Sequence, residues 1–355
     1  MRIPGFYLLL MASLCVACKP ATDTNDATAI QVLEGETMGT YYRISLRGAA
    51  PLTLQAGVDS LLVALNQEVS TYIPSSLISR FNHGDLPAID AETLQSARHF
   101  LANLELSLRI AQQTGNAFNP TIMPLVNYWG FGYTPKRPVT AVDSSAVDSL
   151  MTFVGMDKID YDPVLVSPSA IQLDKQFPGT QLDFSAIAKG YGVDLVASYL
   201  RRRGIQNYLV DIGGEVVASG DKGSPEQPWH VGIAMPREDA ALTDYQVAIP
   251  LRDVAIATSG NYRNFYEANG QKYSHTINPF TGYPERSNLL SASILAPDCA
   301  TADGYATACM VVGLEAAYAL IDSLPNLEGY FIFNDDAGKM QTRMTAGFAE
   351  LLQKK

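Results

Sequence analysis

The sequence predicts an α+β fold in which mixed and antiparallel sheets pack against helices. Three observations support this prediction: long stretches with the period of about 3.6 residues that a helix needs, short β-like runs between them, and no regular βαβ alternation. With 355 residues, 47% of them apolar and 17% charged, the chain can bury a sizeable core. No linker rich in Pro and Ser interrupts the interior, so residues 31–355 are predicted to form one domain.

Four stretches have apolar side chains at helical spacing, namely residues 54–69, 90–113, 186–203 and 301–324. Asp90 is the predicted N-cap of the second helix, and Gly115 follows its end. Ser185 is the predicted cap of the third helix, and Gly204 is expected to stop it. Short β-like runs lie between the helices, at residues 208–212, 215–218, 230–233, 247–251, 290–295 and 330–333.

The first eighteen residues are predicted to be an export signal. Arg2 provides a positive start, and the uncharged residues 5–17 are too few to span a bilayer, which needs about 20. Cys18 follows Cys15-Val16-Ala17 and resembles the acylated cysteine of bacterial lipoproteins, with plain secretion or a buried N-terminal helix as alternatives. Residues 19–30 would form a tether, and the protein would face the periplasm, anchored through Cys18 to a membrane of the bacterial cell envelope.

Charge and cysteine content exclude two classes of protein, those that bind nucleic acid and those held together by disulfides. The chain has 25 Lys and Arg against 36 Asp and Glu, a net charge of −11, and no extended basic run, which excludes nucleic acid as the predicted partner. A bound phosphate would therefore need a metal, a helix N-terminus or one placed lysine. Cys299 and Cys309 are too few for a disulfide framework, and whether they pair is left open; Cys309 lies in an apolar run and is expected to be a packed thiol.

Two segments have the pattern of an anion or cation site. Residues 182–190 run from a strand end into a helix start, where a cap by Ser185 leaves backbone N–H groups for an anion and Lys189 lies one turn inside. Asp303 and Thr307 are four residues apart and would share one helix face, which suits a hard cation. Ordinary helix capping and a surface salt bridge explain the same residues equally well.

Motifs for other chemistries are absent from the sequence. There is no GxxxxGK[ST] loop, GxSxG elbow or HExxH, and the four histidines are scattered, so any metal is expected to have oxygen ligands and to be Mg²⁺. Residues 257–262 and 273–279 are predicted to be polar turns that let the backbone approach a ligand. His275 would be a proton acceptor or a structural histidine, and residues 128–132 would stack on a flat ring or fill a core.

Taken in order, these segments resemble the ApbE family of FAD:protein FMN transferases. The resemblance covers residues 32–345 and rests on residues 38–42, 70–82, 115–121, 124–132, 182–194, 210–215, 257–262, 275–284 and 301–307. It implies an ApbE-like architecture related to the T-fold, and Mg²⁺-dependent transfer of the FMN part of FAD to a threonine hydroxyl of an acceptor protein, with release of AMP. The acceptor is expected to be a subunit of a membrane redox complex.

The resemblance also implies roles for individual residues. The FAD-binding positions are Met38, Tyr72, Ala117, Phe118, Asn119, Asp183, Lys189, His275 and Ile277, and the metal site is the backbone carbonyl of Ala186 with Asp303 and Thr307. His275 is the expected base for the threonine proton, with Asp183 or Asp303 as alternatives. Asn119 and Asn278 stand where many family members carry Asp. An FAD pyrophosphatase that uses water, and a periplasmic flavin-binding lipoprotein without catalysis, are left open.

Overall fold

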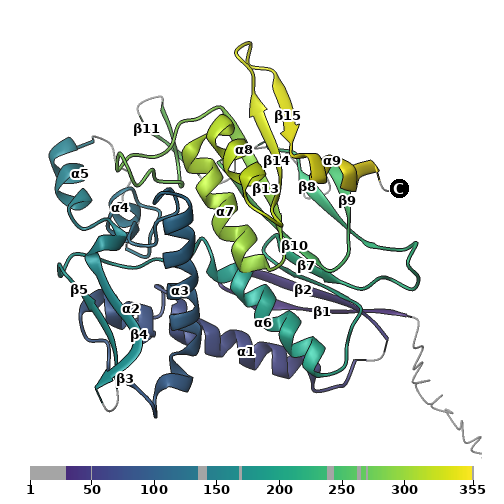
Figure 1. The fold of residues 1–355 in the computed structure, drawn as a ribbon, viewed down its shortest axis with the longest axis horizontal. Helices are drawn as coiled ribbons and strands as arrows, with labels where there is room; N and C mark the ends of the chain where they lie inside the picture. Colours follow the sequence, from purple (N-terminus) through teal and green to yellow (C-terminus); the bar gives the residue numbers. More distant parts are fainter. Residues whose placement is uncertain are drawn as a thin grey trace, which may run out of the picture.

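A large antiparallel sheet forms the centre of the molecule (Figure 1). This computed structural model describes residues 29–48, 50–134, 142–167, 170–237, 244–261, 265–268 and 271–353. In these ranges eight strands pair in the order β1 (Ile30–Thr37), β2 (Thr40–Arg47), β6 (Tyr208–Ile212), β7 (Glu215–Ser219), β10 (Val254–Gly260), β13 (Leu289–Ala296), β14 (Glu328–Asn334) and β15 (Met340–Met344). The predicted signal, with Cys18, and the tether up to residue 28 lie outside the described residues.

Two layers of helices cover one face of this sheet (Figure 1). Helices α6 (Ala188–Arg202), α7 (Cys299–Val312) and α8 (Leu314–Ser323) pack on the strands, and α1 (Leu54–Val69) and α3 (Arg98–Gln113) pack on α6 and α7. Shorter elements are α2 (Leu77–His83), η1 (Leu94–Ser96), α4 (Met123–Tyr128), α5 (Ser144–Met151), η2 (Met156–Lys158) and the sheet of β3 (Ile89–Asp90), β5 (Ala170–Lys175) and β4 (Ile159–Ser167). The expected α+β class is confirmed.

The other face of the sheet is covered by a ribbon and a terminal helix. Strands β8 (Trp229–Ala234) and β9 (Tyr245–Leu251) form the ribbon, and α9 (Ala346–Gln353) follows the last strand. Trp229 and Phe348 are both buried there, against sheet residues such as Ile256. A second ribbon, β11 (Phe265–Ala268) with β12 (Gln271–Ser274), leads into the region of His275. Burying apolar surface on both faces stabilises the sheet.

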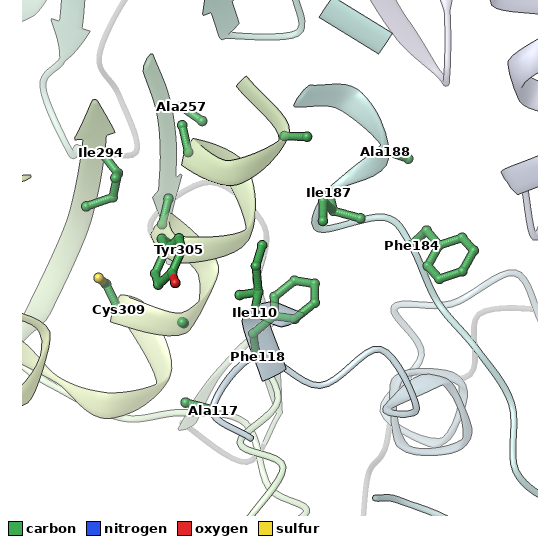
Figure 2. Close-up of a cluster of buried hydrophobic side chains, with 14 of the residues drawn as sticks. Ile110, Ala117, Phe118, Phe184, Ile187, Ala188, Ala257, Ile294, Tyr305 and Cys309 are labelled. Atoms are coloured by element: carbon green, nitrogen blue, oxygen red, sulfur yellow. The ribbon is translucent and has the colours of Figure 1, made fainter. Parts of the chain in front are cut away.

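The core on the helical side positions the residues discussed below. Figure 2 shows Ile110 and Phe118 between α7, which carries Tyr305 and Cys309, and the segment that leads into α6. A Cβ atom on Gly304 would lie 2.5 Å from Ile110 Cδ1, so a larger residue here would displace the Ile110 side chain between α3 and α7. Cys309 is a buried free thiol, as expected, and Cys299 is buried and free as well. Within the described residues, no helix is long and apolar enough to cross a bilayer.

Several predicted element boundaries are wrong. Asp90 does not cap α3; its side chain accepts hydrogen bonds from the Glu92 and Thr93 amides in a local turn, and the helix begins only at Arg98. The fourth predicted helix is two helices, because Gly313 has a φ of 76° that interrupts the ladder. The predicted turn at residues 257–262 is strand β10 up to Gly260. By contrast, α1 and β6 have the predicted bounds.

Candidate active site

A cavity of about 610 Å³ opens where α6, α7, the end of β10 and the loop after β12 meet. This volume is in the range of cofactor-sized pockets. Its walls include all three predicted metal-site residues and all of the predicted FAD-binding residues except Met38. The lining residues from these two sets are Tyr72, Ala117, Phe118, Asn119, Asp183, Ala186, Lys189, His275, Ile277, Asp303 and Thr307.

Three charged side chains lie together in the cavity wall. Lys189, in the first turn of α6, forms an ion pair with Glu215 at the start of β7, and Asp303 of α7 lies beside them. Glu215 and Asp303 are only 3% exposed. Burial would lower the pKa of Lys189, but the carboxylates of Asp303 and Glu215 raise it above its ordinary value, so this lysine is charged. We call Lys189, Glu215 and Asp303 the cavity cluster.

The two carboxylates of the cavity cluster are poorly compensated. Burial raises the pKa of both Glu215 and Asp303, although Lys189 acts in the opposite direction. Asp303 Oδ2 accepts one hydrogen bond, 3.1 Å from the Gly190 amide, whereas the buried Oε2 of Glu215 has no hydrogen-bond partner among the described residues. A further cation or donor at this place would therefore lower the cost of burying two acidic groups.

The predicted cap of α6 is wrong. Asp183 accepts hydrogen bonds from both the backbone amide and the hydroxyl of Ser185, each at 2.8 Å, so Ser185 closes a turn and does not cap the helix. The Ile187 and Ala188 amides donate to Phe184 O, and α6 begins at Ala188 without a side-chain cap. Burial raises the pKa of Asp183, and burial together with Asp183 raises that of Tyr72 nearby.

The face of α7 toward the cavity supplies oxygen atoms. Asp303 and Thr307 both line the cavity from one helix, as their spacing predicted. Thr307 Oγ1 lies 3.1 Å from Ser259 Oγ of β10, and Ala186 lies in the turn before α6. Carboxylate and hydroxyl oxygens are hard donors, and a cation would offset the burial that raises the pKa of Asp303 and Glu215, so the residues present fit Mg²⁺.

Sequence and structure comparisons place the chain among known proteins. A family model described as the ApbE family matches residues 38–331. The chain belongs to the ApbE family. It is 36% identical to the FAD:protein FMN transferase of Vibrio cholerae (89% of this chain, 90% of the relative) and 35% identical to that of Klebsiella pneumoniae (98% and 97%).

Solved ApbE structures share the fold. The flavin transferase ApbE from Vibrio cholerae superposes with a TM-score of 0.76 at 33% identity, covering 91% of this chain and 99% of that one. The apo flavinyl transferase ApbE from Pseudomonas stutzeri gives 0.75 at 30% identity, with 91% and 97% covered. Both support the confirmed fold class.

Asn119 and Asn278 are both built into turns. Asn119 Oδ1 accepts from the Thr121 amide and hydroxyl, which an aspartate could also do. Asn278 Oδ1 accepts from the Phe280 amide, and its Nδ2 donates to Glu285 at 2.7 Å. Asn278 is not a carboxylate, but its hydrogen bond holds the carboxylate of Glu285 at the loop that carries His275.

Other ApbE positions are divided between cavity and core. His275 lines the cavity with its ring in edge contact with Phe131, centroids 6.4 Å apart. Trp129 of the same aromatic run is fully buried and donates from Nε1 to Gly282 O, so it fills a core. Met38 lies in the turn between β1 and β2 with a φ of 51°, packed toward Gly192 and outside the cavity lining, and its role in FAD binding stays a prediction.

Three side chains that line this ApbE cavity had no predicted side-chain role, although residues 257–262 were predicted to approach a ligand through their backbone. Glu215 had no assigned role, because only folding brings β7 against the first turn of α6. Thr258 and Ser259 lay in a predicted turn, yet both line the cavity from the end of a strand. The available signal was a glutamate directly after two glycines, an unusual place for a charge that is then buried.

Proposed function

We propose that this chain is an FAD:protein FMN transferase, which moves the FMN part of FAD onto a threonine hydroxyl of an acceptor protein and releases AMP. The observation that carries the proposal is the cavity cluster, with its half-buried Lys189 and two buried, poorly compensated carboxylates, in a cofactor-sized cavity. The chain is 33–36% identical, over nearly its full length, to proteins named for this activity, which supports the same function.

The cavity offers separate surfaces for the parts of FAD. Apolar residues such as Phe118, Phe131 and Ile277 suit a flat ring. Lys189 supplies a positive charge for the diphosphate. This local charge is needed because the protein has a net charge of −11, which repels the diphosphate. FAD is therefore expected to lie with its diphosphate at the cavity cluster and a ring against the aromatic wall.

The Ala186 carbonyl, Asp303 and Thr307 would hold Mg²⁺. When bound, the ion would neutralise negative charge on the diphosphate oxygens. Burial of Asp303 supports this assignment, because a carboxylate at 3% exposure needs a positive partner. Glu215 keeps Lys189 beside the same place through their ion pair.

The transfer exchanges the phosphoanhydride bond of FAD for a phosphoester bond to threonine. The acceptor threonine oxygen bonds to the FMN phosphorus, the bond from that phosphorus to the bridging oxygen breaks, and AMP takes the bridging oxygen. Lys189 stabilises the charge on the oxygens as this happens. The hydroxyl proton goes to a base of the enzyme, and His275 is the candidate that the cavity offers with a ring at its wall.

The alternative bases are engaged in other contacts. Both oxygens of Asp183 accept hydrogen bonds from Ser185, and Asp303 Oδ2 accepts the Gly190 amide. Using Asp303 as a base would also remove the charge that a metal needs. His275 is therefore preferred over Asp303, and Asp183 stays the alternative base.

One experiment separates this proposal from its rivals. The purified protein is mixed with FAD, Mg²⁺ and a flavin-carrying subunit of a membrane redox complex as acceptor. Flavin fluorescence that stays with the acceptor in a denaturing gel supports the transferase, provided that replacing the target threonine by alanine abolishes it. Free FMN and AMP with no labelled acceptor would instead show a pyrophosphatase, and unchanged FAD a flavin-binding lipoprotein.

The place of action is also a proposal. A lipid on Cys18 would hold the domain at a membrane of the cell envelope, facing the periplasm, near membrane-bound acceptors. The measurement is fractionation of cells that express the full chain or a Cys18→Ala variant. The wild type is expected in the membrane fraction and the variant in the soluble fraction; equal fractionation of both would contradict the anchor.

A further inference from the structure

Helices α6 and α7 exchange hydrogen bonds through two carboxylates. Asp194 of α6 accepts from the first two amides of α7, with Oδ1 2.9 Å from Cys299 N and Oδ2 2.9 Å from Ala300 N. In the opposite direction, Asp303 of α7 accepts the Gly190 amide of α6. Each helix therefore bonds the backbone of the other, and the two contacts are one helical turn apart on both helices.

The backbones of the two helices are in direct contact at this crossing. A Cβ atom on Gly190 would lie 2.4 Å from Cys299 O, so α6 and α7 touch without an intervening side chain. At such a crossing, a change in rotation or translation of α7 moves Asp303 relative to Lys189 directly. Both lie in the cavity wall, Lys189 on α6 and Asp303 on α7.

Helix α7 does not depend on Asp194 for its own start. Asp298 is its N-cap, and the Asp298 side chain accepts the Thr301 amide at 2.8 Å while its backbone oxygen accepts the Ala302 amide. This cap remains when Asp194 is replaced. What Asp194 contributes beyond capping is a bond between the two helices.

We propose that Asp194 is a positioning residue for the cation site at Asp303 and Thr307. Its two hydrogen bonds fix α7 on α6, and so set the place of both oxygen donors relative to Lys189. The proposal rests on the cation site of the proposed function. It assigns Asp194 no contact with substrate.

A matched control exists in the same protein. Glu68 of α1 accepts from the amides of the second and third residues of α3, with Oε2 2.7 Å from His99 N and 2.9 Å from Phe100 N. Like Asp194, it is a carboxylate from one helix that bonds the start of another, but α3 carries none of the proposed cation ligands. Replacing either residue by alanine removes two similar bonds.

The test measures divalent cation binding on the full-length protein. Mg²⁺ is titrated without FAD, and the rise in melting temperature with concentration gives an apparent dissociation constant. Asp194→Ala is expected to weaken Mg²⁺ binding about 10- to 100-fold, as loss of a residue that orients a metal ligand does. Glu68→Ala is expected to lower the melting temperature comparably and leave the dissociation constant unchanged.

The outcomes separate this proposal from the proposed function. Wild-type Mg²⁺ binding that both variants retain would overturn the role of Asp194, and so would an equal weakening in both. No Mg²⁺ binding by the wild type would overturn the cation site itself. If Asp194→Ala does not fold, Asp194→Asn serves, because it keeps an acceptor for one amide but not for two; we then expect a weakening of about 3- to 10-fold.

Discussion

The cavity cluster and the polar contacts between α1, α3 and α6 bury the same kinds of groups in opposite ways. In the second set, which we call the helix seam, Glu68 Oε2 accepts two backbone amides and His99 Nδ1 lies 2.9 Å from the hydroxyl of Tyr191. In the cavity cluster, Glu215 keeps a buried oxygen without a partner among the described residues. Glu68 and His99 are buried as Glu215 is, at 7% and 1% exposed against 3% for Glu215.

The difference separates buried polar groups that stabilise the fold from buried polar groups that are available to bind a ligand. Groups of the helix seam receive their partners from neighbouring helices, so removing one costs stability. The two carboxylates of the cavity cluster line the cavity and repel each other, so removing one of them costs ligand binding. Burial alone does not separate the two sets; the hydrogen bonds that each group makes within the protein do.

The largest effect is expected at Asp303. Asp303→Asn keeps the shape and an acceptor for the Gly190 amide but removes the charge, so FMN transfer should fall by at least about 1,000-fold, because a metal contact contributes several kcal/mol to the transition state. The rate of acceptor labelling at saturating Mg²⁺ measures this. The melting temperature without metal should stay the same or rise, since a poorly compensated charge has gone.

Asp298→Asn is the control for Asp303→Asn. Asp298 lies at the start of the same helix and caps it, outside the cavity lining. This variant should keep transfer within about 3-fold, because asparagine is also a good N-cap. Full Mg²⁺-dependent transfer by Asp303→Asn would show that the metal assignment is wrong.

Lys189→Met tests whether the charge of Lys189 offsets the cost of burying Glu215 and Asp303. Methionine has a similar length but leaves the buried Glu215 and Asp303 without their cation, and loss of the partner of a fully buried charge typically costs about 3–5 kcal/mol, which the half-buried position of Lys189 reduces. We expect the free energy of unfolding in urea to fall by about 3 kcal/mol, and Mg²⁺ to restore part of it. Arg43→Gln, which breaks an exposed pair with Glu34, should cost under about 1 kcal/mol.

The two histidines extend the comparison. His275→Ala should lower transfer about 100-fold with little change in melting temperature, because a general base contributes at least that much to the rate and the ring lies at the cavity wall. His99→Ala should lower the melting temperature and leave the transfer rate nearly unchanged, since its ring is buried beside Tyr191. Near-normal transfer by His275→Ala would remove this histidine from the mechanism.

The parts of the fold that local pattern determines were predictable. Helix α1 has the predicted bounds because its apolar spacing is regular, and β6 is bounded by turn residues. Strand β10 was not predicted, because Thr258 and Ser259 are polar where they line the cavity, and its pairing with β7 and β13 decides its conformation. The sequence predicts Ser185 as a cap because nothing in it shows that the folded turn brings the Ser185 hydroxyl to Asp183 instead.

The site was predictable as a set of residues but not as a set of contacts. Ordered motifs assigned Lys189 and Asp303, and both lie in one cavity. The ion pair to Glu215 and the bonds of Asp194 to α7 connect segments that are far apart in the chain. Such long-range contacts arise from packing, and no spacing rule in a single sequence encodes them.

The smallest expected effect lies in the helix seam and depends on pH. Burial raises the pKa of Glu68 from its ordinary 4.5 to about 6, so its contribution to stability is fully present below pH 4.5 and is lost as the pH rises through 6. Burial lowers the pKa of His99 from 6.5 to about 4, so its contribution is present above pH 6.5 and is lost on acidification. The two residues oppose each other over the same window.

Glu68→Gln removes one side of this opposition while keeping an acceptor for the two amides of α3. Urea unfolding of the variant and the wild type at pH 4.5, 5.5 and 6.5 measures the result. Relative to the wild type, the variant should gain about 1 kcal/mol from the lowest to the highest pH, which allows for incomplete desolvation of Glu68. A constant difference across the window would mean that Glu68 titrates alike in the folded and unfolded chain, and that the helix seam accommodates its charge as fully as water does.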